Sequence, residues 1–317
     1  MPINAKPKEI SGVLGLFKAR ASAASLTKNR STAVGVSHLV LDSPHSGTHY
    51  PADFEFACLL PLLRQAEDTH VEKLFDFYPE VGAAWVEAHF PRSYLDANRS
   101  LADIDPLLLD EPWPDYLSAS AAQEKSVKVS LGKGLAWRLL DTGEPIYARR
   151  LSVAELQRRI DTCWQPYHAA IAAAVKAAFD AHGFCIHINC HSMPAVASSH
   201  ATEFPGLAHA DFVVGDRDGS SAASALSQLV CAHVRDAGFS AEYNHPYKGV
   251  EIVRRHSNPA RHCHSIQLEI NRRLYMDEQT LALSPGFEAV KTVLRTLLQR
   301  LKELDLAALQ ALENAST

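Results

Sequence analysis

The chain has 317 residues, of which 47% are hydrophobic and 21% are charged, and its formal net charge is -5. This is the composition of an ordinary globular protein, and it excludes a disordered chain. The acidic balance also argues against a nucleic-acid-binding protein, because such domains usually carry a basic face.

The beginning of the chain shows no sign of a membrane anchor or an export signal. No stretch approaches the roughly 18 consecutive apolar residues that a membrane-spanning helix needs, so we expect no membrane partner. Residues 1–33 carry several Lys and Arg and only one short apolar run, which favours a flexible basic arm over a signal peptide. The six cysteines include no CxxC pair and do not indicate a disulfide framework. We therefore expect a cytoplasmic protein with one α/β domain over residues 34–317.

Strands and helices alternate along the rest of the chain. In chain order, the patterns predict a strand over 37–43, a helix over 59–78, a strand over 83–86, loops over 101–135, a helix over 152–182, strands over 184–189 and 211–215, a helix over 220–237, a strand over 264–270 and a helix over 284–312. This alternation is typical of a three-layer α/β fold, with a mainly parallel or mixed sheet and helices on both faces.

Four polar clusters fall at or just beyond the ends of predicted strands. They are PHSG (44–47), DANR (96–99), NCHSMP (189–194) and EINR (269–272). Ligands of such sheets bind beyond the carboxyl ends of the strands, and these ends converge in space. The clusters therefore predict one site that they share.

Two of these clusters offer a histidine that suits a metal. His45 and His191 each follow or end a predicted strand, although a hydrogen-bonded loop histidine is the ordinary alternative. Two such histidines and one carboxylate would match a catalytic zinc site, which keeps its fourth position for water. Asp68, on the predicted helix 59–78, is our candidate carboxylate. Its rivals are Glu67 and Glu72, and all three could equally lie on a solvated helix face.

The other two clusters offer an acid and a cation. Glu269 lies on the polar face of a strand whose other face is apolar, and a carboxylate there is costly unless it is paired or functional. Its two interpretations are a catalytic acid–base residue and a buried ion pair with Arg272. Asn98 and Arg99 could bind a substrate carboxylate through the planar guanidinium, or Arg99 could form a surface salt bridge.

Nine short motifs in collinear order resemble the N-formylglutamate amidohydrolase family. They are SPHSGTHYP (43–51), DTHVEKLF (68–75), PRSYLDANRS (91–100), GEPIYARRLS (143–152), QPYHAAI (165–171), NCHSMP (189–194), VVGDRDGSS (213–221), NHPYKGVEIVRR (244–255) and QLEINRRLYMDE (267–278). The family is similar in turn to the zinc carboxypeptidase and aspartoacylase group. The resemblance implies hydrolysis of a small-molecule substrate, N-formyl-L-glutamate, to formate and glutamate during histidine degradation.

The resemblance also implies roles for individual residues. Zinc or another divalent metal would be held by His45, Asp68 and His191. Asn98 and Arg99 would bind one substrate carboxylate, and Glu269 would act as the general base. Arg254 and Arg272 are candidates for the second carboxylate.

Two positions depart from the patterns of these relatives. Asn189 stands where the family usually has Asp two residues before the second histidine, and Thr48 stands where the wider group has its acidic ligand. An Asn can still accept a hydrogen bond from the imidazole, but without charge, so the metal would be held less tightly. Two alternatives therefore stay open: hydrolysis of another N-acyl amino acid or short peptide, and a non-catalytic protein that binds a metal or a small ligand.

Overall fold

A computed structural model describes residues 17–20, 37–114, 117, 126–198 and 204–315. A seven-stranded sheet with the order β1-β3-β2-β4-β7-β5-β6 forms its centre. The strands are β1 (Phe17–Arg20), β2 (Leu39–Ser43), β3 (Ala84–Ala88), β4 (Cys185–Met193), β5 (Phe212–Gly215), β6 (Ala241–Tyr243) and β7 (Cys263–Asn271). Strands β3, β2, β4 and β7 are parallel, whereas β1 and β5 run antiparallel to β3 and β7. The sheet is therefore mixed.

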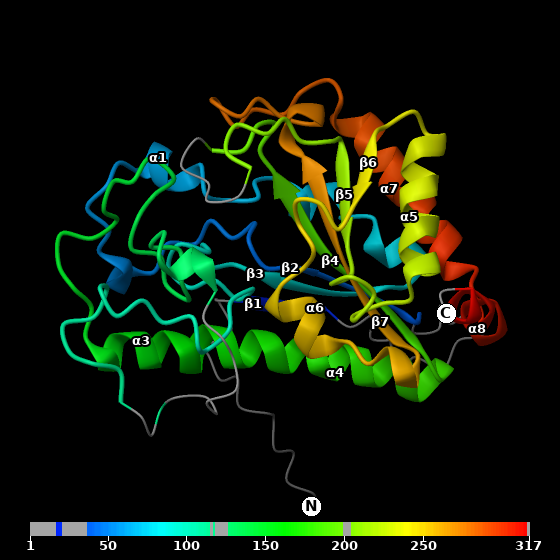
Figure 1. Cartoon of the computed structure of the whole chain (residues 1–317), viewed down its shortest axis with the longest axis horizontal. Helices are drawn as coiled ribbons and strands as arrows, with labels where there is room; N and C mark the ends of the chain where they lie inside the picture. Colours follow the sequence, from blue (N-terminus) through cyan, green and yellow to red (C-terminus); the bar gives the residue numbers. More distant parts are fainter. Residues whose placement is uncertain (1–16, 21–36, 115–116, 118–125, 199–203, 316–317) are drawn as a thin grey trace, which may run out of the picture.

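Helices cover both faces of this sheet (Figure 1). They are α1 (Leu60–Arg64), α2 (Val71–Leu74), α3 (Val153–Arg159), α4 (Gln165–His182), α5 (Ser224–Asp236), α6 (Glu251–His256), α7 (Phe287–Lys302) and α8 (Leu306–Asn314). The long α4 crosses one face, where it contacts β2, β3 and β4, while α5 packs against α7 and α8 on the opposite side. The predicted three-layer α/β fold is confirmed.

The period of two along a strand gives the sheet an apolar and a polar face near its centre. Leu39, Leu41 and the isoleucines of β4 and β7 belong to the hydrophobic core that α5 and α7 cover. The alternate positions face α4, and near the carboxyl ends of the strands they are polar. In the parallel register Asp42 pairs with Asn189, and His191 pairs with Glu269. The fold therefore concentrates polar side chains at one end of one face.

Most strand and helix predictions are confirmed, with shifted ends. Strand β4 continues to Met193, so His191 lies within the strand and not beyond it. The predicted helix 152–182 is present as α3 and α4, joined by a π-helical turn at Ile160–Trp164. It begins with a capping box at Ser152 and ends at Gly183, whose φ of 77° suits glycine.

Three features differ from the sequence-based expectation. The helix predicted over 59–78 is wrong, because only the short α1 and α2 form there and Asp68 lies between them. The helix predicted over 284–312 is broken into α7 and α8. Strand β6 and helix α6 were not predicted, and both are too short to show a clear periodicity.

Of the predicted basic arm, residues 1–33, only 17–20 are among the described residues. Residues Phe17–Arg20 form the edge strand β1, antiparallel to β3. Within the described parts of the chain, no helix is both long and apolar enough to span a membrane.

Candidate metal site

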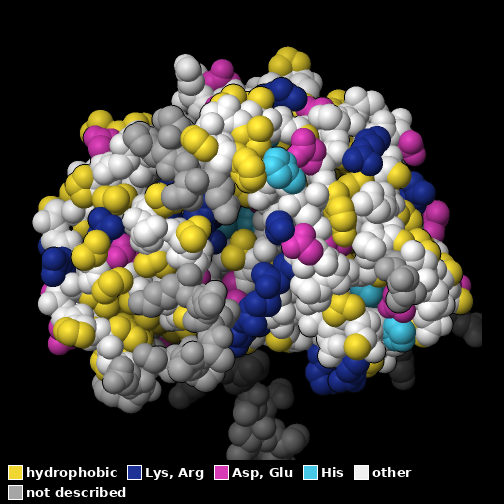
Figure 2. Space-filling model, viewed as in Figure 1, with side chains coloured by type: hydrophobic (Ala, Val, Ile, Leu, Met, Phe, Trp, Pro, Cys, Tyr) yellow, Lys and Arg dark blue, Asp and Glu magenta, His cyan; other side chains and the backbone are white. Residues whose placement is uncertain are grey.

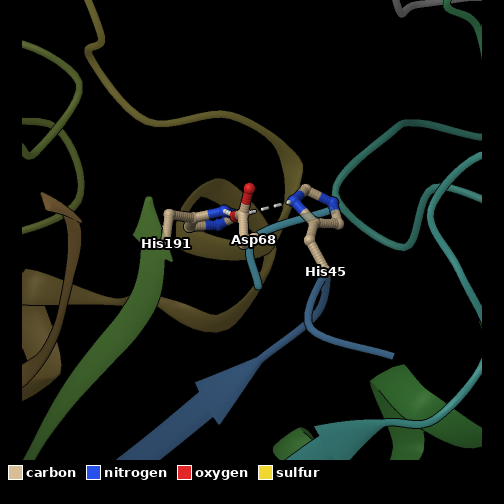
Figure 3. A group of neighbouring side chains, drawn as sticks. All are labelled: His45, Asp68 and His191. Carbon is tan, nitrogen blue, oxygen red and sulfur yellow. Dashed lines mark hydrogen bonds and ion pairs between the residues drawn. The ribbon is translucent and has the colours of Figure 1, made fainter. Parts of the chain in front are cut away.

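Two histidines and one aspartate meet at the carboxyl end of the sheet. His45 lies on the loop after β2, Asp68 between α1 and α2, and His191 near the end of β4. Figure 3 shows Asp68 between the two imidazoles. Its Oδ2 lies 3.1 Å from Nδ1 of His191 and 3.5 Å from Nδ1 of His45. All three residues are buried, and one ligand atom from each lies within 4.8 Å of the others.

The surroundings of His45 leave one ring nitrogen unused. Its Nε2 lies 2.7 Å from Oδ1 of the buried Asp96, which can only accept a hydrogen bond at this position. The other nitrogen, Nδ1, is buried and makes no hydrogen bond to any described residue. An imidazole that donates one N–H to a carboxylate and directs its other nitrogen into a ligand group is the arrangement seen at metal sites. The residues therefore fit a divalent metal.

A second chain of contacts orients His191. Its Nε2 lies 2.8 Å from Oδ1 of Asn189. The amide nitrogen of Asn189 donates in turn to both carboxylate oxygens of Asp42, at 2.9 and 3.1 Å. This second contact fixes which end of the Asn189 amide faces the imidazole. Burial opposes ionisation of Asp42, but hydrogen bonds from His187, Tyr167 and Asn189 outweigh it and lower the pKa of the carboxyl.

Two arginines hold the carboxylate of Asp68. Arg272 donates from Nη2 to Asp68 Oδ1 at 3.1 Å, and Nη1 of Arg92 lies 3.7 Å from the same oxygen. Burial alone would raise the pKa of Asp68, but the hydrogen bond to His191 and the charge of Arg92 keep it well below its usual range. Asp68 is therefore a carboxylate, which is the form that binds a metal.

Glu269 faces the same cavity from β7. Its Oε1 accepts a hydrogen bond from Nε2 of Gln267 at 2.8 Å. Among the described residues, no Lys or Arg nitrogen lies within 4.0 Å of Glu269, and Arg272 pairs with Asp68 instead. This geometry does not support the buried Glu269–Arg272 ion pair. Burial raises the pKa of Glu269, and the nearby charge of Asp68 acts in the same direction.

A cavity of about 360 Å³ opens over these residues, and several positively charged side chains line it. Arg92, Arg99, Lys133 and Arg272 are among them. Figure 2 shows further Lys and Arg side chains near the middle of the visible face, in the region of α6. Arg99 is buried and donates to the backbone oxygens of Lys133 and Asn98, and no carboxylate of the described residues lies within 4.0 Å of its nitrogens. Burial and neighbouring cations lower the pKa of Lys133 to about 8.

Three of the predicted substrate-binding residues already form hydrogen bonds or ion pairs with other residues of the chain. Asn98 accepts from the backbone N–H of Ile252 and donates to Gln267 Oε1. Besides Asp68, Arg272 donates to Ser192 and to the backbone oxygen of Gln65. Arg254 is not among the residues that line the cavity, and its guanidinium pairs with Glu251.

Several residues that matter at this site were not predicted from the sequence. Asp42, Arg92, Asp96 and Lys133 join the site through contacts with residues that are far away in the sequence. Asp96 lies in one of the four polar clusters, but nothing in that cluster indicates that it contacts His45. The only signal for Asp42 is a charged residue next to the apolar run Leu39–Leu41 of its strand.

Comparisons with known proteins identify relatives of this chain by sequence and by overall fold. Residues 37–276 match the family described as N-formylglutamate amidohydrolase. An N-formylglutamate deformylase from Pseudomonas aeruginosa is 32% identical over 83% of this chain and 92% of its own length. One from Pseudomonas putida is 28% identical over 76% and 82% of the two chains. The crystal structure of N-formylglutamate amidohydrolase from Ralstonia eutropha JMP134 superimposes with a TM-score of 0.80 and 41% identity, covering 91% of this chain and 97% of that one.

Proposed function

Because the chain belongs to the N-formylglutamate amidohydrolase family and is therefore a hydrolase of an amide bond, we propose that it cleaves N-formyl-L-glutamate to formate and L-glutamate. The proposal includes a divalent metal, with zinc as the first choice. It also includes a place in histidine degradation and a cytoplasmic location, both of which rest on the family resemblance.

The observation that carries the metal is the buried group of His45, Asp68 and His191, in which Nδ1 of His45 makes no hydrogen bond to any described residue. Two imidazoles and one carboxylate are a donor set that zinc uses at catalytic sites. A bound zinc ion would polarise the scissile carbonyl and lower the pKa of a water molecule to about 7.

Glu269 is the proposed general base. The hydrogen bond from Gln267 holds its Oε1, which leaves Oε2 as the oxygen that can take a proton from the attacking water. The same carboxyl group would then deliver the proton to the nitrogen of the departing glutamate. Its register partner His191 keeps it next to the metal ligands.

Arg99 and Lys133 are the proposed partners of the two substrate carboxylates. Arg99 lines the cavity and keeps one guanidinium nitrogen, Nη2, without a hydrogen bond to any described residue. Lys133, which pairs with the half-exposed Asp141, supplies a second positive charge at the same wall. Arg254 is a weaker candidate for the second carboxylate, because its guanidinium forms an ion pair with Glu251.

The test is to measure metal content and formate release on the same purified protein. We expect about one zinc per chain, loss of activity with a chelator, and recovery when zinc is added back. His45→Ala and His191→Ala should lose both metal and activity. His49→Ala removes an exposed histidine of the same loop and should keep both. Full activity without metal would refute the metal, and a metal-loaded protein that releases no formate would refute the substrate.

A further inference from the structure

A second chamber of about 600 Å³ adjoins the cavity over the metal site. The two share wall residues, among them Lys133, Pro194, Tyr247, Val250 and Gln267. Ligand pockets commonly measure about 300–1,000 Å³, so the first cavity alone has room for a molecule as small as N-formylglutamate. The second chamber therefore exceeds what the proposed substrate needs.

The wall of this chamber is held in place by backbone packing and hydrogen bonds. Residues 244–250 connect β6 to α6 and form one side of it. The side chain of Asn244 accepts from the backbone N–H of Asp216 at 2.9 Å and donates to its carboxylate at 2.8 Å. Gly215 has no Cβ, and one placed there would come within 2.6 Å of the backbone of Lys248. The chamber is therefore preformed.

One ring nitrogen of a buried histidine in this chamber has no hydrogen-bond partner among the described residues. His209 is 4% exposed, and its Nδ1 donates to the backbone oxygen of Pro194 at 2.7 Å. A carbonyl oxygen can only accept, so Nδ1 carries the proton and Nε2 of the neutral ring is an acceptor. Nε2 is buried and makes no hydrogen bond to any described residue. Buried polar atoms are normally satisfied, so a donor from a ligand or from water is expected there.

We propose that the second chamber binds an extension of the substrate beyond N-formylglutamate, and that His209 Nε2 accepts a hydrogen bond from an amide N–H of that extension. Much of the remaining lining is apolar, with Leu131, Pro194, Ala197, Phe204 and Val250, and Lys128, Lys133 and Lys248 line the chamber beside them. An extension of peptide type, which alternates apolar carbon with N–H donors, suits this lining. The inference rests on the proposed function, because the bond that is cleaved lies at the same metal site.

The chemistry of the cleavage would be unchanged. Water forms a C–O bond to the acyl carbon, the C–N bond breaks, and the departing nitrogen of glutamate takes the proton. Two substrates carry the required N–H at different ends. In N-(acetylglycyl)-glutamate it lies in the acyl group, and in N-formyl-γ-glutamylglycine it lies beyond the side-chain carboxyl.

The test compares kcat/KM for these two compounds and for N-formylglutamate in the wild type and in two variants. His209→Asn keeps a donor for Pro194 near the position of Nδ1 but removes the Nε2 acceptor. His209→Gln is the reciprocal control, because its amide oxygen can replace the Nε2 acceptor. We expect His209→Asn to lower kcat/KM for an extended compound about tenfold relative to N-formylglutamate, as the loss of one hydrogen bond would. His209→Gln should show a smaller change in this ratio.

The extended compound that shows this effect identifies the end of the substrate that enters the chamber. The inference is overturned if the wild type neither cleaves nor is competitively inhibited by either compound, since Nε2 would then meet only water. It is also overturned if His209→Asn changes all substrates equally. Wild-type hydrolysis of N-formylglutamate is scored separately, so the proposed function can stand when this inference fails.

Discussion

Asn189 occupies a position where its amide must serve two neighbours with opposite needs. Its oxygen faces Nε2 of His191, and its nitrogen donates to Asp42. An amide meets both needs, whereas a carboxylate could accept from His191 but would confront Asp42 with a second negative charge. In the family pattern an Asp at position 189 would place a negative charge next to His191. Here the charge belongs to Asp42 on β2, and the neutral amide of Asn189 lies between Asp42 and the imidazole.

This arrangement predicts the behaviour of a charge swap. Asn189→Asp alone should weaken zinc binding about 10–100-fold, the range typical of altered partners of a metal-binding histidine. Asp42→Asn alone should also weaken it, because the Asn189 amide is then no longer held in one orientation. The double variant Asp42→Asn with Asn189→Asp restores one amide and one carboxylate and should recover most of the affinity. Zinc dissociation constants from chelator competition measure this, and a double variant no better than Asn189→Asp would disprove the coupling.

Glu269 allows catalysis to be separated from binding. Glu269→Gln keeps the size of the side chain and a possible contact with Gln267, so the fold and the metal content should be unchanged. Turnover should fall by about 10²–10⁴-fold, because the residue can no longer take a proton from water. Metal analysis and formate release on the same sample decide the outcome. If the metal is lost together with activity, Glu269 is a ligand, and near-normal turnover with metal bound rejects it as the base.

At the scale of elements, the segment 59–78 shows how a helical pattern can mislead. Its apolar residues recur at helical spacing, but they belong to two different cores. Leu63 packs in the cluster around Phe54, whereas Val71 and Leu74 pack in the core under α7. The chain therefore leaves one core and enters the other, and the helix breaks between them. At the break the N–H of Asp68 bonds to the backbone oxygen of His45 at 3.0 Å, which brings the carboxylate to the site.

The His45 loop depends on close contact with the end of β3. A Cβ at Gly47 would lie 2.4 Å from the backbone carbon of His89 and from the oxygen of Phe90. Gly47→Ala should therefore push the loop away, lower the free energy of unfolding by about 1–3 kcal/mol and weaken zinc binding. Urea unfolding and zinc titration measure the two effects. His49→Ala, at an exposed position two residues further on, should show neither effect. If Gly47→Ala changes stability and zinc binding no more than His49→Ala does, the loop accommodates the added Cβ and the close contact is not needed.

At the scale of the whole molecule, the strands and their carboxyl ends were predictable because they depend on local pattern and on a general rule of parallel sheets. The contacts that orient the two histidines of the site were not predictable in this way. Asp42 meets Asn189, and Asp96 meets His45, only after the strand order and the path of the 94–99 segment are fixed. That segment has no helix or strand, and helix α4 and the π-helical turn support it through His168 and Trp164, which donate to the backbone oxygens of Ala97 and Arg99.

His168 also belongs to a buried pair whose titration links folding to pH. Its Nδ1 lies 2.8 Å from Nε2 of His256 on α6, and both side chains are shielded from water. Burial lowers the pKa of His168 to about 4, and burial together with the charge of His168 and His187 lowers the pKa of His256 well below 6.5. The other charged groups that act on the pair are Arg255, Glu251 and Asp42.

Both pKa values are lower in the folded than in the unfolded chain, where histidine titrates near 6.5. As the pH falls from 6.5 towards 4, these two histidines therefore become protonated in the unfolded chain while they stay neutral in the folded chain. This contribution to stability is complete above pH 6.5 and is lost below it, at about 1.4 kcal/mol per pH unit for each such histidine. Urea unfolding at pH 7 and pH 5 should show a loss that shrinks in His256→Gln but not in His49→Gln, whose ring is exposed. Because zinc binding is itself proton-linked, the difference between variants is the quantity to compare. An equal loss in both variants would place the acid sensitivity elsewhere in the molecule.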